Sequence, residues 1–234
     1  MDFLLMIESV PVLLQGLPLT LSLVAFSVGL GFVVALGVAV VRLSPWRIAA
    51  RLAEAYVFVF RSTPLLVQLF LIYYGLGQFS WIRESFLWPL LREPYGCAVL
   101  ALMLNTGAYS SEILRGGIQS VPAGQVEAAR ACGMSGVLLF RRIIAPLALR
   151  QALPAYGNEI ILMVKASSLA STVTLLEITG LARKLISQTY AVFEIFLLAG
   201  AIYLLINLII TRLIKLAERS LGMHPPAVTS GGTF

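Results

Sequence analysis

The chain has 234 residues, of which 59% are hydrophobic and only 12% are charged, and its mean hydropathy is +0.92. A soluble domain of this length could not bury so much apolar surface, so the composition excludes an ordinary soluble enzyme or binding domain. The formal net charge of +6 does not require a nucleic-acid partner, because cationic loops on one side of a membrane account for it. The sequence therefore predicts an all-α integral membrane protein.

Five apolar segments have the length of a membrane span, which requires roughly 20 residues. Two of them are uninterrupted and cover residues 17–41 and 192–213. The other three cover residues 56–75, 94–113 and 152–171 and contain polar or charged residues. In the first of these three, Thr63 and Pro64 are expected to break the helix, because proline has no N–H for a helical hydrogen bond. Because such groups at membrane depth normally face a bundle interior or a watery cavity, we expect these three spans to line an enclosed path.

Lysine and arginine are distributed unevenly over the loops between these spans. The loops after the first, third and fifth spans hold Arg42, Arg47, Arg51, Arg115, Arg130, Arg141, Arg142, Arg150, Arg212, Lys215 and Arg219. The opposite loops hold only Arg83, Arg92, Arg183 and Lys184. Since cationic loops stay inside, we predict an outside N-terminus and a cytoplasmic C-terminus. We also predict one transmembrane domain over residues 1–222 and a disordered tail over 223–234.

A polar segment over about 120–148 follows the third span on the predicted cytoplasmic side. Pro122 favours a helix start, and Gly133 can end that helix because a residue without Cβ turns easily at positive φ. Ser135 can cap a second helix that carries Arg141 on its polar side. The segment predicts a compact helix-turn-helix, which is either a docking surface for a partner protein or an amphipathic helix pair at the membrane surface.

The chain lacks the residues for a catalytic or metal site. None of its three lysines follows the glycines of a G-x-x-x-x-G-K-[ST] loop, so ATP hydrolysis would need another polypeptide. The single histidine, His224, lies in the predicted tail, and Cys97 and Cys132 are predicted on opposite sides of the membrane. We therefore expect no enzyme activity, no bound cofactor and no metal.

Three sequence motifs resemble one known family. The polar segment contains Glu127-Ala128-Ala129, then Gly133 after three residues, Ile143 after nine more, and Pro146, with Ala145 where the family has leucine. The second span contains Arg61-Ser62-Thr63-Pro64-Leu65-Leu66-Val67-Gln68, and the fourth contains Asn158-Glu159 and Lys165-Ala166-Ser167-Ser168-Leu169. Together they resemble the permease subunits of ATP-binding-cassette (ABC) importers, specifically the polar amino-acid family of histidine, arginine, ornithine, glutamine and opine permeases.

The resemblance implies a type I importer fold of about five spans in the bacterial inner membrane, with a periplasmic N-terminus. It implies that the polar segment docks on an ABC ATPase. That separate chain, and not this one, would bind ATP and Mg²⁺. The expected ATPase-coupling residues are Glu127, Ala128, Ala129, Gly133, Arg141, Ile143 and Pro146. The other expected partners are a periplasmic amino-acid-binding protein and a second permease, with a homologous heteromer favoured over a homodimer. Transport would occur by alternating access.

Glu159 is the main candidate for binding a basic amino acid or opine, because a carboxylate at membrane depth is costly unless it meets a cation. The other candidate substrate residues are Arg61, Gln68, Asn158, Lys165 and Ser167. Two alternatives stay open: Glu159 could form an internal ion pair with Arg61 or Lys165, and Arg61 could snorkel to the membrane surface or pack against Glu112. Some family members that bind basic substrates carry a further acid at the position of Ala166. Either this subunit binds a less demanding side chain or works beside a partner subunit, or it has no complete site.

The alternative function is a secondary transporter or channel that is not coupled to an ATPase. A secondary transporter would normally show inverted internal repeats and more spans, and the two halves of this sequence show no convincing repeat. A channel would have no need of the docking segment. The sequence therefore favours an ATP-driven importer of polar amino acids.

Overall fold

The computed structural model describes residues 3–220, which are helical with short connections and contain no β-strand. The α-helices are α1 (Phe3–Leu14), α2 (Leu17–Arg42), α3 (Arg47–Ser62), α4 (Leu65–Phe70), α5 (Ser80–Arg83), α6 (Trp88–Leu91), α7 (Pro94–Gln119), α8 (Ala123–Ala131), α9 (Gly136–Leu139), α10 (Ala145–Ala166), α11 (Ile178–Thr189) and α12 (Val192–Ser220). Segments Leu71–Gly75 and Phe140–Ile144 are π-helical, and Leu76–Gln78 and Ser167–Val173 are 3₁₀-helical. The predicted tail over 223–234 lies outside the described residues.

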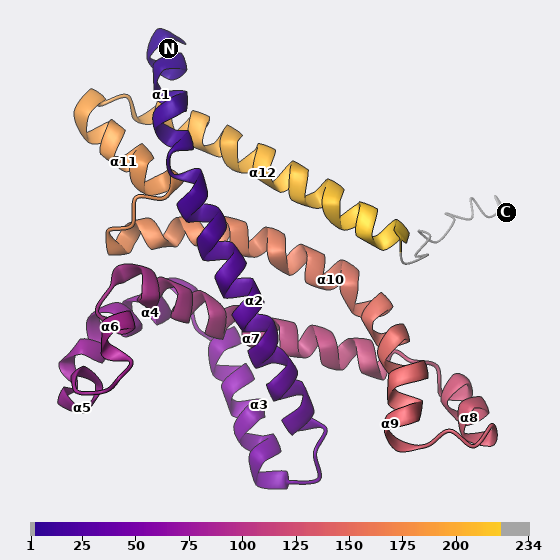
Figure 1. The fold of residues 1–234 in the computed structure, drawn as a ribbon. Helices are drawn as coiled ribbons and strands as arrows, with labels where there is room; N and C mark the ends of the chain where they lie inside the picture. The colour runs from indigo at the N-terminus through magenta and orange to yellow at the C-terminus, as the bar shows by residue number, and fades with distance from the viewer. Residues whose placement is uncertain (1–2, 221–234) are drawn as a thin grey trace, which may run out of the picture.

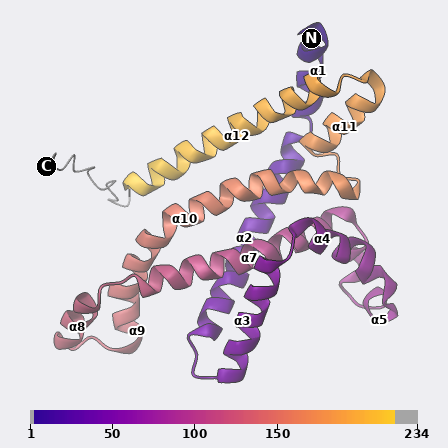
Figure 2. The same ribbon diagram turned by 180° about the vertical axis from the view of Figure 1, so that it is seen from behind.

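The long helices form an open bundle in which α2 crosses α7 and α10 (Figures 1 and 2). Helix α3 returns alongside α2, and α12 packs on the other side of α10. Helices α8 and α9 project from one end of the bundle, whereas α5 and α6 lie at the other end. The bundle therefore presents α8 and α9 together as a separate projection.

The expected spans are found, and one of them contains a sharp bend. Within residues 3–220, α2, α7 and α12 are long and apolar enough to cross a membrane, and the number of spans rises to five if each of two bent helix pairs counts as one. The span expected over 56–75 is a sharply bent pair of helices, because Arg47–Ser62 and Leu65–Gln78 meet at 107°. The predicted break at Thr63 and Pro64 is confirmed.

Helices α2 and α7 approach closely because small residues face each other. A Cβ atom on Gly31 would clash with Thr106 Cγ2 and lie 3.1 Å from the carbonyl oxygen of Met103. Ala35 and Ala39 continue the same buried face of α2 toward Leu114. Without a hydrophobic force between helices in lipid, such small-residue faces allow the van der Waals contact that stabilises the bundle.

The break at Pro64 is braced by two amide side chains. Pro64 has no N–H to donate to the carbonyl of Phe60, four residues earlier. That carbonyl instead accepts from Gln68 Nε2 at 2.9 Å and from Asn105 Nδ2 at 3.3 Å. Gln68 Nε2 also lies within hydrogen-bond distance of Thr63 O at 3.1 Å and Thr63 Oγ1 at 2.8 Å, and Gln68 Oε1 accepts from Asn105 Nδ2 at 3.1 Å. The polar groups at the break therefore have hydrogen-bond partners, and these bonds connect α3 and α4 to α7.

A second buried network fixes α11 to α12. Glu177 is fully buried and caps α11, because its carboxylate accepts from the backbone N–H of Thr179 at 2.9 Å and of Gly180 at 2.8 Å. The Tyr203 hydroxyl on α12 donates to the same carboxylate at 2.6 Å. Glu177 therefore caps α11 from inside the protein and ties it to α12.

The brace predicts a specific loss of stability for Gln68→Ala. The change leaves Asn105 without its side-chain acceptor and removes a donor from Phe60 O, so unfolding should become easier by about 1–3 kcal/mol. We would measure the thermal unfolding temperature of the purified protein in one detergent.

Gln78→Ala is the matched control, because the Gln78 amide donates to Tyr74 O at 3.2 Å on the exposed surface. This substitution should change the free energy of unfolding by no more than about 0.5 kcal/mol. Equal losses in the two variants would contradict the bracing role of Gln68.

Candidate functional site

The predicted turn at Gly133 is confirmed and has the geometry of a Schellman motif. Gly133 has φ of +79°, and its N–H donates to the carbonyl of Arg130 at 2.9 Å. The N–H of Met134 donates to the carbonyl of Ala129 at 3.0 Å. These two bonds end α8 and turn the chain toward α9, as expected for a glycine that follows a helix.

The expected capping role of Ser135 is wrong. Ser135 does occupy the position before α9, but its side chain makes no capping hydrogen bond. The next residue, Gly136, has φ of +51°, which favours glycine, so a second glycine shapes this turn. The role of Gly136 in the turn was not predicted, because the start of the second helix was assigned to capping by Ser135.

The second helix of the polar segment is continuous with the fourth span. The helical backbone runs from Gly136 to Val173 through α9, the π-helical turn, α10 and the 3₁₀ segment. The helical backbone therefore continues across the expected boundaries near residues 148 and 152. Pro146 cannot donate to the carbonyl of Arg142, and the chain accommodates it with a wide π-helical turn at Phe140–Ile144 rather than with a break. We call residues 120–148 the knob.

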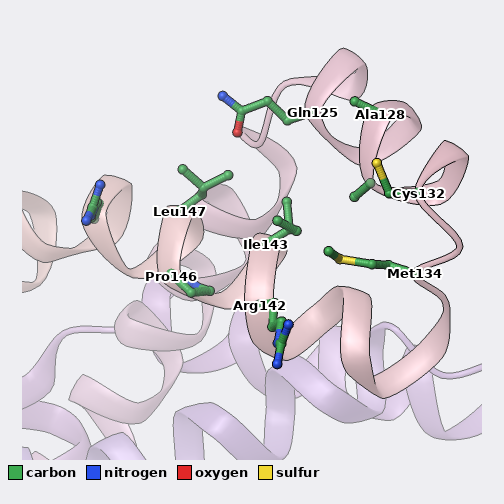
Figure 3. Close-up of a pocket in the computed structure, with 10 residues that line it drawn as sticks. Gln125, Ala128, Cys132, Met134, Arg142, Ile143, Pro146 and Leu147 are labelled. Atoms are coloured by element: carbon green, nitrogen blue, oxygen red, sulfur yellow. The ribbon is translucent and has the colours of Figure 1, made fainter.

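The predicted coupling residues lie mostly on the knob surface. Exposed side chains are Glu127, Ala128, Gly133, Arg141 and Pro146, whereas Ala129 is buried and Ile143 is half-buried. In Figure 3, Ala128 on α8 and Ile143 and Pro146 on the facing helical segment border one hollow. The structure thus brings residues from both ends of the Glu-Ala-Ala motif to a shared surface.

Glu159 lies inside the bundle, on the side of α10 that faces α7. It is 5% exposed, and the Arg61 guanidinium attracts its carboxylate without forming an ion pair within 4 Å. The Thr106 hydroxyl lies near this carboxylate but makes no hydrogen bond of normal geometry. Lys165 is exposed one and a half turns further along. Neither Arg61 nor Lys165 forms the expected ion pair with Glu159, and Arg61 acts on it only through a longer-range electrostatic attraction.

The alternative contact between Arg61 and Glu112 is wrong. The Arg61 guanidinium lies over the ring of Tyr109, 5.2 Å from its centroid, in a cation–π contact. Glu112 instead forms ion pairs with Arg42 and with Arg115, the latter at 2.6 Å. Arg61 is therefore free of any carboxylate at ion-pair distance among residues 3–220 and remains exposed.

The remaining candidate residues do not form one cluster with Glu159. Gln68 is buried and fully engaged in bracing the Pro64 break, so its amide is not free for a ligand in this conformation. Asn158 is exposed, and Ser167 is buried with its hydroxyl donating to the carbonyl of Val164 at 2.7 Å. The structure thus associates Arg61 with Glu159 and separates the other candidates from them.

Three residues of α7 near the site were not selected as candidates from the sequence. Asn105 braces the break, Thr106 lies beside Glu159, and Tyr109 holds Arg61. A signal existed, because these polar residues lie in the middle of an apolar span and polar groups there face the bundle interior. Glu159 was selected because it is a polar residue at membrane depth, and the same criterion applied to the third span would have selected these three residues.

The sequence matches the family described as "Binding-protein-dependent transport system inner membrane component" over residues 27–223. It is 57% identical over 232 residues to the "Nopaline transport system permease protein NocM" of Agrobacterium fabrum, covering 99% of this chain and 96% of that protein. It is 59% identical over 220 residues to the "Octopine transport system permease protein OccM" of Rhizobium meliloti, covering 94% and 90%.

A solved structure has the same fold. It is described as "Crystal structure of an amino acid ABC transporter with histidines", and it matches with a TM-score of 0.85 and 38% identity. The match covers 94% of this chain and 99% of that one. These similarities favour the importer over an uncoupled channel or secondary transporter, and they confirm the type I importer fold of a transport subunit.

The matched length, the helical fold and the identity to these permeases lead to one conclusion. The chain is a multi-pass bacterial inner-membrane protein and belongs to the family of binding-protein-dependent transport system inner membrane components, the permease subunits of ABC importers.

Proposed function

We propose that this permease moves a basic amino acid or an opine across the inner membrane, and that the substrate's cationic group binds Glu159. The observation that carries the proposal is a carboxylate buried between α10 and α7 with no ion-pair partner within 4 Å among the described residues. A buried acid of this kind is expensive unless a cation meets it. A transported cation would supply the missing partner.

The relatives support this substrate class. Nopaline and octopine, named for two relatives, each contain the guanidinium group of arginine, and histidine carries an imidazole that can be protonated. All three also carry a carboxylate. Glu159 would hold the cationic end, while Arg61 is placed to attract the carboxylate from the neighbouring α3 terminus. The pair therefore matches a substrate with charges of both signs.

Transport requires that Glu159 become accessible, and the helical backbone offers a route for that change. The second half of the knob, from Gly136 onward, belongs to the same helical segment as Glu159, Gly136–Val173. An ABC ATPase that binds ATP and Mg²⁺ and closes against the knob would therefore move the carboxylate relative to Arg61, which lies on α3. Such movement would produce alternating access driven by ATP hydrolysis on a separate chain.

The assembly includes further partners. A periplasmic binding protein would deliver the substrate, and a second permease would complete the path. Because Ala166 stands where basic-substrate relatives carry an additional acid, a homologous heteromer is favoured, with the partner providing the missing group. The cationic loops favour a periplasmic N-terminus and a cytoplasmic C-terminus. Exposed apolar residues on the faces of α2 and α12, such as Phe26, Val33 and Leu205, suit contact with lipid.

Glu159→Gln should lower uptake of arginine or octopine by about tenfold or more, since a hydrogen bond to a charged group is worth about 1.5–3 kcal/mol. Uptake of a neutral amino acid such as glutamine should fall less. The measurement is initial uptake of each radiolabelled substrate by proteoliposomes that contain the complete importer and ATP.

Glu177→Gln is the control, because Glu177 is also a buried carboxylate but is occupied by Tyr203 and two backbone N–H groups. It should lower the uptake of all substrates to the same degree through folding. If Glu159→Gln also reduced cationic and neutral substrates equally, Glu159 would have no part in recognising the cation.

Gly133→Val should weaken coupling between ATP hydrolysis and transport. Valine at φ of +79° is strained by about 1–2 kcal/mol, so the turn between α8 and α9 should shift. We would measure substrate-stimulated ATP hydrolysis and uptake in the same proteoliposomes.

Gly124→Val is the matched control for this turn. A Cβ atom added to either glycine would meet open space, but only Gly133 has positive φ. Gly124→Val should therefore retain the normal ratio of transport to hydrolysis. An unchanged ratio in Gly133→Val would remove the turn from the coupling path.

A further inference from the structure

A groove lies on the inner side of the knob, between α8 and the beginning of α10. Its volume is about 550 Å³, and its apolar lining consists of Ala128, Ala129, Met134, Ile143, Pro146 and Leu147. Figure 3 shows the Met134 side chain reaching across from the α8–α9 connection toward Ile143. The groove is therefore large enough for one or two apolar side chains of another protein, and methionine gives it an adaptable wall.

The charge around the groove is strongly one-sided. Arg142 and Arg150 line it directly. Residues 120–150 hold four arginines, Arg130, Arg141, Arg142 and Arg150, and a single acid, Glu127. None of the four arginines forms an ion pair within residues 3–220. A partner that fills the groove should therefore present acidic residues beside its apolar side chain.

We propose that this groove receives an apolar side chain of the ATPase, flanked by carboxylates that pair with Arg142 and Arg150. The inference rests on the proposed ATPase coupling and specifies its geometry. The knob inserts into the ATPase, and a side chain of the ATPase in turn inserts into the groove of the knob. The ATPase then holds α8 and α10 at once. A pull on this groove acts directly on the helical segment that carries Glu159.

Cys132 provides a direct probe of the groove. Its side chain is exposed and lines the groove, whereas Cys97 is buried in α7. We would measure the initial rate of N-ethylmaleimide modification at each cysteine by peptide mass spectrometry. The samples are membranes that contain the complete importer and membranes in which this permease is produced without its ATPase.

Modification of Cys132 should be at least tenfold slower in the complete importer than without the ATPase. Cys97 should stay unmodified in both samples, which verifies that the fold is intact. Equal rates at Cys132, in an importer from which the ATPase still co-purifies, would overturn the groove proposal while leaving ATPase docking intact. Slow modification in both samples would also overturn it, because lipid or the second permease would then fill the groove. Loss of co-purification would instead contradict the proposed coupling itself.

The charge requirement has its own test. Arg142→Glu should reduce the amount of ATPase that co-purifies with the permease by about tenfold, because it places an acid against the partner's carboxylates. Arg212→Glu is the matched control, since Arg212 is an exposed arginine on α12 outside the groove. Equal losses in the two variants would show that general positive charge, and not the groove, recruits the ATPase.

Discussion

The unbroken helical backbone from Gly136 to Val173 is the constraint on which the rest of this structure depends. It begins in the exposed knob, passes the π-helical turn at Phe140–Ile144 and continues beyond Glu159. A helix resists stretching because its carbonyl and N–H groups are bonded along the axis. Force applied at the knob therefore reaches the interior of the bundle along one covalent and hydrogen-bonded element, without passing through a flexible loop.

The second span supplies the fixed side against which this element can move. Pro64 breaks the span, but Gln68 and Asn105 bond the exposed carbonyl of Phe60 and hold the two halves to α7. The break also positions Arg61 at the end of α3, over Tyr109 and within electrostatic reach of Glu159. Relative movement of α10 and α3 would thus separate two opposite charges, and a substrate with charges of both signs could take the place of each partner.

The sequence predicted the features that depend on local chemistry. Apolar length identified the spans, the lack of a side chain at Gly133 identified the turn, and Pro64 identified the break. The sequence failed to predict the role of residues whose partners lie far away along the chain. Gln68 was interpreted as a ligand because its acceptors and Asn105 cannot be recognised from spacing. For the same reason, a contact between Glu112 and Arg61 stayed open as an alternative, whereas Glu112 pairs with Arg42 and Arg115. The helical continuity between the knob and the fourth span was not predicted. Pro146 locally favours a helix boundary, but the π-helical turn before it allows the helix to continue.

The most direct test of this account is a pair of spin-label distances in the assembled importer, with Cys132 replaced by serine and the buried Cys97 retained. One pair joins Val137 to Leu162 along the helical segment, and the other joins Val137 to Ile48 on α3, all three at exposed positions. Between the nucleotide-free and ATP-trapped states, we predict that the first distance stays constant while the second changes. A change in the first distance with no change in the second would show that the segment bends at its π-helical turn and does not carry motion from the knob to Glu159.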